Sequence, residues 1–237
     1  MKLKIFVSTL TLLAVSSVHA GTLYTYTDWT SATDSSGATP GSASGTLTFG
    51  SNVVNVGYAG EVTFAQINNI GTNYYNLPTD FTGSVVANAP GPDIIALQEA
   101  SAFTDTLTFS QPLVNPVIDI VSLGAGNTVG YNFNATPIIL SQGTDDWGGC
   151  DTCLSVSGNT VDGAEGTGAV EFVGTYSSIA WTTTGGEYWN GVTVGAAAIG
   201  TGGGTTATPE PGSLLLVGSG ITGLVGMLRR RRVAARS

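Results

Sequence analysis

The residues that could carry chemistry gather in two short segments in the second half of the chain. In the first segment, Asp145, Asp146 and Asp151 surround Trp147, with glycines nearby. Carboxylate oxygens are ligands that Ca²⁺ favours, and an indole ring can stack on a sugar ring. The segment therefore predicts a calcium loop or a sugar-binding edge, and an exposed turn whose tryptophan packs inward is the alternative. Its spacing fits no EF-hand or glycine-rich calcium repeat.

The second segment, residues 187–189, places an acid beside two aromatic rings. With Glu165 or Glu171, Glu187 would supply the carboxylate pair of a glycoside hydrolase, which needs two acids about 5 to 9 Å apart. Trp189 is a second candidate for stacking on carbohydrate. Acids beside core aromatics are also common at the strand ends of β-sandwiches. We therefore expect a structural role here, no catalytic residue and no required cofactor.

Cys150 and Cys153 are the only cysteines, within the segment Gly-Gly-Cys-Asp-Thr-Cys. In an oxidising compartment such a pair is expected to form a disulfide, which stabilises the fold by roughly 2 kcal/mol in the chain-entropy model. A zinc site would need two further ligands. A thioredoxin-like redox pair would need a helix and a βαβ unit, and the sequence predicts neither. The sequence therefore predicts a structural disulfide.

Charge is distributed very unevenly along the chain. Residues 21–208 contain no lysine, arginine or histidine, whereas fifteen of the sixteen acidic residues lie there. Nucleic-acid binding is excluded for this body because it has no cation to neutralise phosphates. Histidine-dependent nucleophilic catalysis, Schiff-base lysines and arginine phosphate clamps are excluded for the same reason. Carboxylate pairs, tyrosines, oxygen-ligated metal and aromatic stacking remain possible, and the high negative charge favours solubility.

The body that must position these residues is predicted to be all-β. Helical periodicity is nearly absent from residues 21–199, and short alternating or β-branched runs are separated by Gly, Asn, Ser and Pro. Ten or so strands joined by short turns indicate an antiparallel β-sandwich or jelly roll, and a barrel is the alternative. Residues 31–45 are expected to form a polar loop, and Thr-Leu-Thr-Phe at 46–49 and 106–109 predicts two similar strands. The runs are 22–26, 46–49, 52–56, 61–64, 106–109, 117–123, 129–133, 138–140, 170–173, 179–181 and 192–194.

The amino terminus has the organisation of a secretory signal peptide, residues 1–20. Lys2 and Lys4 precede a mostly apolar run, and small residues then occupy the −3 and −1 positions of a cleavage site between Ala20 and Gly21. An uncleaved anchor is the alternative, but the apolar run is too short for it. Signal peptidase and the secretion machinery are therefore expected partners.

The carboxyl terminus combines three features in a fixed order. A flexible Gly/Thr-rich linker at 200–208 leads to the motif Pro209, Glu210, Pro211. The apolar run 212–228 would rise about 25 Å as a helix, close to the thickness of a bilayer core, so we expect one transmembrane helix there. The arginines that follow place this end in the cytoplasm and the body outside. These residues are Arg229, Arg230, Arg231 and Arg232.

This order of motif, apolar helix and basic stop resembles the PEP-CTERM sorting signal of Gram-negative bacteria. The resemblance implies an exported protein that is processed by an exosortase. It implies anchoring in the inner membrane with the body in the periplasm before processing, and then a place on the outer surface or in the extracellular matrix. A plain tail anchor, the alternative, would not need Pro209, Glu210 and Pro211.

The body also resembles that of other PEP-CTERM proteins, in residues 27–32, 109–112, 115–116, 165–166 and 187–189. This second resemblance implies no known activity. Together the two favour a surface- or matrix-associated structural or adhesive protein linked to extracellular polysaccharide or biofilm. A calcium-assisted carbohydrate-binding module is the alternative, and a glycoside-active enzyme is the third hypothesis.

Overall fold

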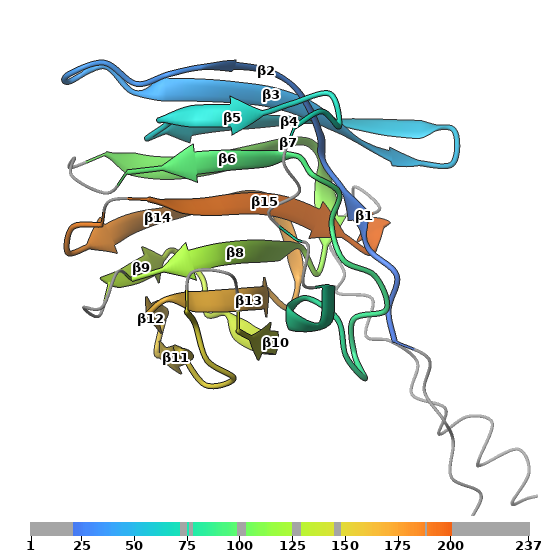
Figure 1. The fold of residues 1–237 in the computed structure, drawn as a ribbon. Helices are drawn as coiled ribbons and strands as arrows, with labels where there is room; N and C mark the ends of the chain where they lie inside the picture. Colours follow the sequence, from blue (N-terminus) through green and yellow to red (C-terminus); the bar gives the residue numbers. More distant parts are fainter. Residues whose placement is uncertain are drawn as a thin grey trace, which may run out of the picture. The chain divides into compact units, whose positions relative to one another are not determined.

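The computed structural model describes residues 21–71, 75, 78–98, 103–124, 129–144, 148–187 and 189–200. These residues form sixteen strands and one short 3-10 turn, η1 (Pro78–Asp80). The strands make two large antiparallel sheets that pack face to face (Figure 1). The predicted all-β antiparallel sandwich is therefore confirmed. The predicted signal peptide and the predicted transmembrane helix lie outside the described residues, and within that range no helix is long and apolar enough to span a bilayer.

The two sheets contain seven and nine strands. The seven-stranded sheet has the order β10-β13-β8-β15-β6-β5, and β1 pairs with β15. The nine-stranded sheet has the order β11-β12-β9-β14-β7-β4-β3-β2, and β16 pairs with β7. The strands of the first sheet are β1 (Thr25–Tyr26), β5 (Phe64–Gln66), β6 (Ile94–Leu97), β8 (Val117–Leu123), β10 (Ile138–Gly143), β13 (Gly166–Glu171) and β15 (Asn190–Ala196). Those of the second are β2 (Asp28–Thr33), β3 (Gly41–Phe49), β4 (Asn52–Gly60), β7 (Thr104–Val114), β9 (Val129–Phe133), β11 (Leu154–Ser157), β12 (Thr160–Gly163), β14 (Thr175–Thr184) and β16 (Ala198–Ile199).

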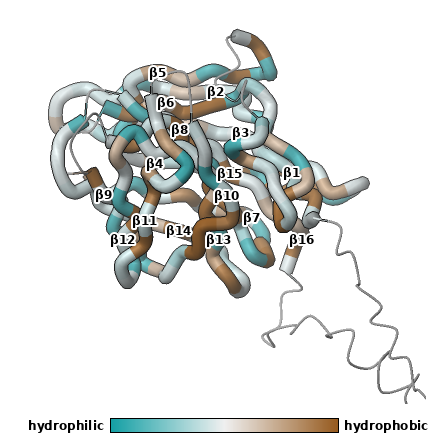
Figure 2. Tube along the Cα trace, turned by 60° about the horizontal axis from the view of Figure 1, so that its bottom comes forward, coloured by the Kyte–Doolittle hydropathy of each residue, from teal (hydrophilic) through white to brown (hydrophobic). Residues whose placement is uncertain are grey.

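The nine-stranded sheet buries one face and exposes the other. Its strands alternate apolar residues with small polar ones, which is the pattern of a sheet covered on one side. In β3, Ala43 and Leu47 are buried, whereas Ser44 and Thr48 are exposed. Figure 2 shows hydrophobic segments interleaved with lighter, more hydrophilic ones along the chain. The two Thr-Leu-Thr-Phe segments lie in β3 and β7, on either side of β4.

The seven-stranded sheet is covered on both faces. Every residue of β8 and β15 is buried. The outer face of β8 is covered by the segment between β5 and β6, in which Tyr75 and Phe81 pack with Val121, and Val86 packs with Val117. Figure 1 shows η1 of this segment lying over one end of the sheet. The double cover explains why β8 is an almost continuous apolar run instead of an alternating one.

Aromatic rings dominate the core between the two sheets. The ring centroid of Trp181 lies 5.6 Å from that of Tyr131, 5.5 Å from that of Phe133 and 6.0 Å from that of Tyr58. Trp29 is fully buried at the other edge, and its indole Nε1 donates a hydrogen bond to Thr193 Oγ1 at 3.1 Å. Buried rings of this size supply a large part of the apolar contact area in a sandwich.

Two sequence predictions about strand boundaries are wrong. The segment 31–45 is not one polar loop, because β2 extends to Thr33 and β3 begins at Gly41. The expected strand at 61–64 is displaced to Phe64–Gln66. Small polar residues carry little intrinsic strand preference, so pairing with a neighbouring strand decides their structure. Here β3 pairs with β4 along its whole length, from Gly41 opposite Gly60 to Phe49 opposite Asn52.

The end of β4 offers a test of this packing. A Cβ atom on Gly60 would lie 2.1 Å from Oδ1 of Asp105, so Gly60→Ala should lower the free energy of unfolding by about 1–3 kcal/mol. Gly83→Ala is the control, because its Cβ would meet nothing within 4 Å. Urea unfolding measures both variants. Equal midpoints for the two would contradict the close approach at Gly60.

Candidate functional site

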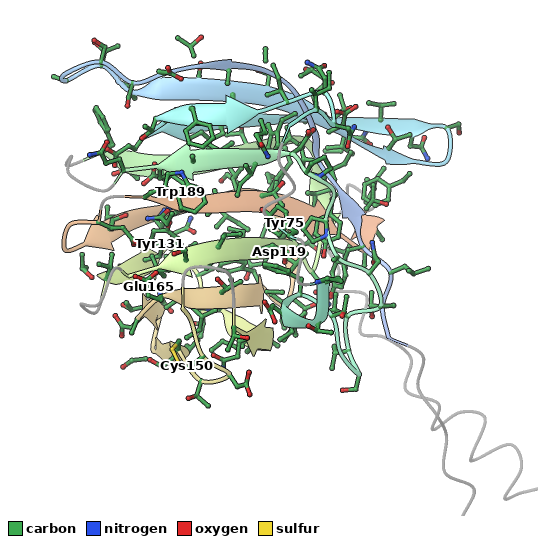
Figure 3. The ribbon with its side chains drawn as sticks, viewed as in Figure 1. Tyr75, Asp119, Tyr131, Cys150, Glu165 and Trp189 are labelled. Carbon is green, nitrogen blue, oxygen red and sulfur yellow. A yellow bond between two sulfur atoms is a disulfide. The ribbon has the colours of Figure 1, made fainter. Side chains whose placement is uncertain are left out.

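Two of the three glutamates that the sequence indicated, Glu165 and Glu187, lie together at one end of the sandwich. Figure 3 shows Tyr131, Glu165 and Trp189 toward one end, and Asp119 and Tyr75 toward the other. Burial raises the pKa of Glu187 and the nearby charge of Glu165 adds to the rise, so these two carboxyl groups are the acid pair of this end. Glu171 does not join them; it lies at the end of β13 and accepts a hydrogen bond from the Tyr24 hydroxyl at 2.9 Å.

Glu187 is held just before β15 and is 6% exposed. Its Oε2 accepts hydrogen bonds from the backbone N–H of Gly124 at 2.6 Å and from Nδ2 of Asn190 at 3.3 Å. Desolvation raises the pKa of Glu187 to about 7, and the Glu165 charge adds to the rise, whereas the two hydrogen bonds oppose it. Glu187 therefore exchanges a proton near neutral pH, which is the property of a general acid or base.

Glu165 is positioned by an irregular segment of backbone. Ser122 and Glu165 both adopt left-handed conformations, with φ of 56° and 57°. Ser122 lies in the β-bulge between β8 and β13, Glu165 directly precedes β13, and the Ser122 hydroxyl donates to Glu165 Oε2 at 2.7 Å. The backbone N–H of Ser122 in turn donates to Thr167 Oγ1 at 2.9 Å. A left-handed backbone conformation costs free energy in residues other than glycine. These hydrogen bonds therefore stabilise a conformation that would otherwise be unfavourable.

The disulfide lies beside the same segment. Cys150 and Cys153 are bonded to each other, and the backbone N–H of Ala164 donates to the carbonyl of Cys153 at 3.0 Å. Gly149 also approaches the Glu165 carbonyl closely, since a Cβ there would lie 2.3 Å from it. The disulfide loop therefore fixes the chain that carries Glu165. Cysteine spacing alone predicts the bond but does not predict this position.

The remaining sequence candidates are divided between exposed, packed and undescribed positions. Asp151 lies in an exposed turn next to the disulfide. Trp189 is half-buried, and its ring stacks on Phe64 with centroids 6.4 Å apart. In the part of the chain that the structure describes, no group of three or more His, Cys, Asp or Glu residues has the geometry of a metal site. The calcium and stacking hypotheses also depend on residues outside the described range, which are Asp145, Asp146 and Trp147.

Both acids of the pair are engaged in holding loops. Glu187 joins the start of β15 to Gly124 at the end of β8, and Glu165 fastens the bulge through Ser122. Asn190 extends this network, because its Oδ1 accepts a hydrogen bond from the buried hydroxyl of Tyr131. A hydrolase needs carboxyl groups that face a sugar in a cleft. These carboxyl groups instead face the ends of neighbouring strands.

Sequence reasoning found the acids but missed their partners. Ser122, Asn190 and Tyr131 belong to strands that are distant in the chain and meet only in the folded sheets. The serine offers one retrospective indication, since it interrupts the apolar run of β8 close to Gly124. A polar residue followed by glycine in such a run is compatible with a bulge.

Comparison with known families adds an observation about the other end of the chain. Residues 207–232 match the model of the PEP-CTERM protein-sorting motif. No curated protein and no solved structure matches the chain significantly. The matched residues include Pro209, Glu210, Pro211 and the four arginines.

The chain is therefore an exported protein with an antiparallel β-sandwich body and a membrane-anchored carboxyl-terminal signal. It carries the PEP-CTERM sorting motif, and its processing partner is accordingly an exosortase.

Glu187 gives the stability of the protein a specific pH dependence. Because its pKa is raised in the folded state, the folded chain binds a proton that the unfolded chain releases between about pH 4.5 and 7. Stability is highest below this window and falls as pH rises through 7. We expect the Tm to drop by several degrees between pH 5 and 8, since each kcal/mol shifts the Tm by about 2–4 °C in a domain of this size.

The variant Glu187→Gln separates this effect from those of other carboxyl groups. Glutamine keeps an acceptor for Gly124 but does not titrate, so the drop between pH 5 and 8 should become smaller. Asp151→Asn is the control, because Asp151 is exposed. A Glu187→Gln profile as steep as that of the unmodified chain would contradict the role of Glu187.

Proposed function

We propose that the protein is a non-enzymatic component of the cell surface or extracellular matrix, where its sandwich associates with extracellular polysaccharide. The observation that carries the proposal is the sorting motif at 207–232, joined to a body with no lysine, arginine or histidine. The motif directs the chain out of the cytoplasm to an exosortase. The composition then restricts what the body can do there.

The described chemistry supports binding in preference to catalysis. Of the two acid pairs that the sequence indicated, the one that lies together, Glu187 with Glu165, is engaged in hydrogen bonds to Gly124, Asn190 and Ser122. The body cannot neutralise phosphate, and its charge of about −15 opposes close contact with anionic partners. Among the possible classes of partner, an uncharged polymer rich in hydroxyl groups experiences the least electrostatic repulsion from this negatively charged body.

The order of events follows from the arrangement of the two ends. The predicted signal peptide begins export and is removed between Ala20 and Gly21, and the apolar run 212–228 then holds the chain in the inner membrane. Processing near Pro209, Glu210 and Pro211 releases the body from this anchor. Proline cannot extend a helix toward its amino terminus, so the segment before the anchor stays accessible to a protease.

Mass spectrometry of the mature termini after cell fractionation tests the proposal. We expect a mature chain that starts at Gly21, has lost the residues after the sorting motif, and is recovered from the surface or matrix fraction. Replacing Pro209, Glu210 and Pro211 with alanine should leave a full tail in the inner membrane. Alanine at Thr205 and Thr206 is the control and should leave processing unchanged. An intact chain folded in the cytosol would refute the proposal.

A further inference from the structure

A groove crosses the exposed face of the nine-stranded sheet, away from the acid pair. It spans β2, β3, β4 and β7 and has a volume of about 620 Å³, within the usual range for ligand sites of about 300–1,000 Å³. Its polar lining includes Thr30, Ser44, Thr46, Asn55, Thr108 and Ser110. Among the described residues that line it, none has a charged side chain.

The groove is hollow because a glycine replaces a side chain in a row of hydroxyl groups. In the paired strands, Ser44 lies opposite Gly57, Gly57 opposite Thr108, and Thr108 opposite Ser178. A Cβ on Gly57 would meet one atom within 4 Å, Thr108 Oγ1 at 2.9 Å. The space above Gly57 is therefore open to solvent, and its neighbours form the two sides.

The hydroxyl and amide groups around Gly57 are regularly spaced. Adjacent strands are about 4.8 Å apart, and residues on one face repeat about every 6.8 Å along a strand. Several of these groups also stiffen the sheet. Ser110 Oγ accepts the backbone N–H of Asn55 at 2.8 Å, and Thr30 Oγ1 donates to the Ser44 carbonyl at 3.2 Å. Hydroxyl oxygens have further lone pairs, so they remain able to accept from a ligand.

The electrostatic setting determines the ligand class. The groove presents donors and acceptors without charge, on a body that carries about −15. Asp28 pairs with Thr46 at the edge of the sheet, but it lies outside the lining, and its Oδ1 accepts a hydrogen bond from Asn69. An anionic ligand would be repelled, and a cation would find no carboxylate in the lining. A chain of neutral sugars has matching hydroxyl groups and no charge.

We propose that this groove binds a segment of uncharged polysaccharide, through hydrogen bonds to Ser44, Asn55 and Thr108 over the open floor at Gly57. The inference rests on the proposed association with polysaccharide and gives it a site and a ligand class. Phe109 is the one aromatic residue among the described lining residues, and it is buried, so binding uses hydrogen bonds without ring stacking. A single site is accordingly weak, with a Kd on the order of 1 mM. Many copies in a matrix gain affinity through avidity.

Gly57→Val tests the site with little risk to the fold. Gly57 has an extended backbone and valine favours strands. The one atom that the new Cβ would crowd is Thr108 Oγ1, 2.9 Å away, which can rotate aside, so the fold should be kept. The side chain fills the groove and should weaken glycan binding by about tenfold or more. Ala59→Val is the control, since Ala59 is exposed on the same strand, two residues away and outside the lining.

A second pair of variants tests hydrogen bonding without filling the space. Thr108→Val removes one hydroxyl group from the groove and should weaken binding by about three- to tenfold. Thr106→Val makes the same change two residues away in β7, outside the lining, and should leave binding unchanged. Equal effects of the two variants would show that the hydroxyl face binds without a defined groove, and would overturn the assignment.

Affinity electrophoresis suits so weak an interaction. The full-length chain, in a polyoxyethylene detergent that carries no sugar, is run through native gels containing a neutral glucan or mannan, or a polyuronate. Retardation by a neutral polymer, independent of salt and of chelator, is the expected result. Retardation by the polyuronate alone, or a requirement for Ca²⁺, would overturn the inference.

Two further outcomes distinguish failure of the groove from failure of the proposed surface location, and glycan binding from binding of a second copy of the chain. No retardation by any neutral polymer, with normal export and tail processing, would refute the groove and leave the surface location in place. Sedimentation measures self-association of the same variants. A dimer that is lost in Gly57→Val, in a chain that binds no glycan, would assign the groove to a second copy and overturn the inference.

Discussion

The fold depends on burying carboxyl groups without any basic side chain to pair with them. Asp105 is almost completely buried, and it accepts hydrogen bonds from the Tyr58 hydroxyl at 2.5 Å and from the backbone N–H of Glu61 at 2.9 Å. Desolvation nevertheless raises its pKa to about 6. Asp93 uses the backbone N–H groups of Trp29 and Asn69 in the same way. Backbone amides and hydroxyl groups therefore replace salt bridges as the partners of these two carboxyl groups, and Asp93 in this way joins the segment before β6 to β2 of the other sheet.

This constraint divides the molecule into two unlike faces. The seven-stranded sheet is covered on its outer side, where burial raises the pKa of Asp119 well above its ordinary range and the nearby Tyr26 moderates the rise. The nine-stranded sheet is open and presents hydroxyl groups, amides and glycine. Within the nine-stranded sheet, Asp105 is buried and Asp28 and Asp162 lie on strands near the edges, so the middle of the open face is neutral. A strongly acidic chain thus keeps one neutral surface, on the nine-stranded sheet, to which an uncharged ligand can bind.

Local sequence patterns predicted the all-β architecture. They failed where pairing between distant strands determines the strand boundaries and the neighbours of a residue. Alternating residues such as Thr106-Leu107-Thr108 predict strands because one face must be buried. The segment 31–45 has no such alternation, and its two stretches of strand form by pairing with each other and, for β3, with β4. The acid pair was one of two combinations that the sequence left open. Gly57 could not be recognised among 34 glycines, because its importance comes from standing between Ser44 and Thr108 in a register that only the folded sheet defines.

The pairing of β1 with β15 has a consequence for biogenesis. Thr25 lies opposite Ala196, and the backbone N–H of Thr27 donates to the carbonyl of Val194 at 3.0 Å. The first strand to leave the translocon, β1, thus cannot pair until β15, nearly the last strand, has emerged. Long-range pairing of this kind slows folding. The sandwich can close only after almost the whole body has emerged. A tail that remains in the bilayer would then retain each newly exported chain at the membrane until its folding is complete.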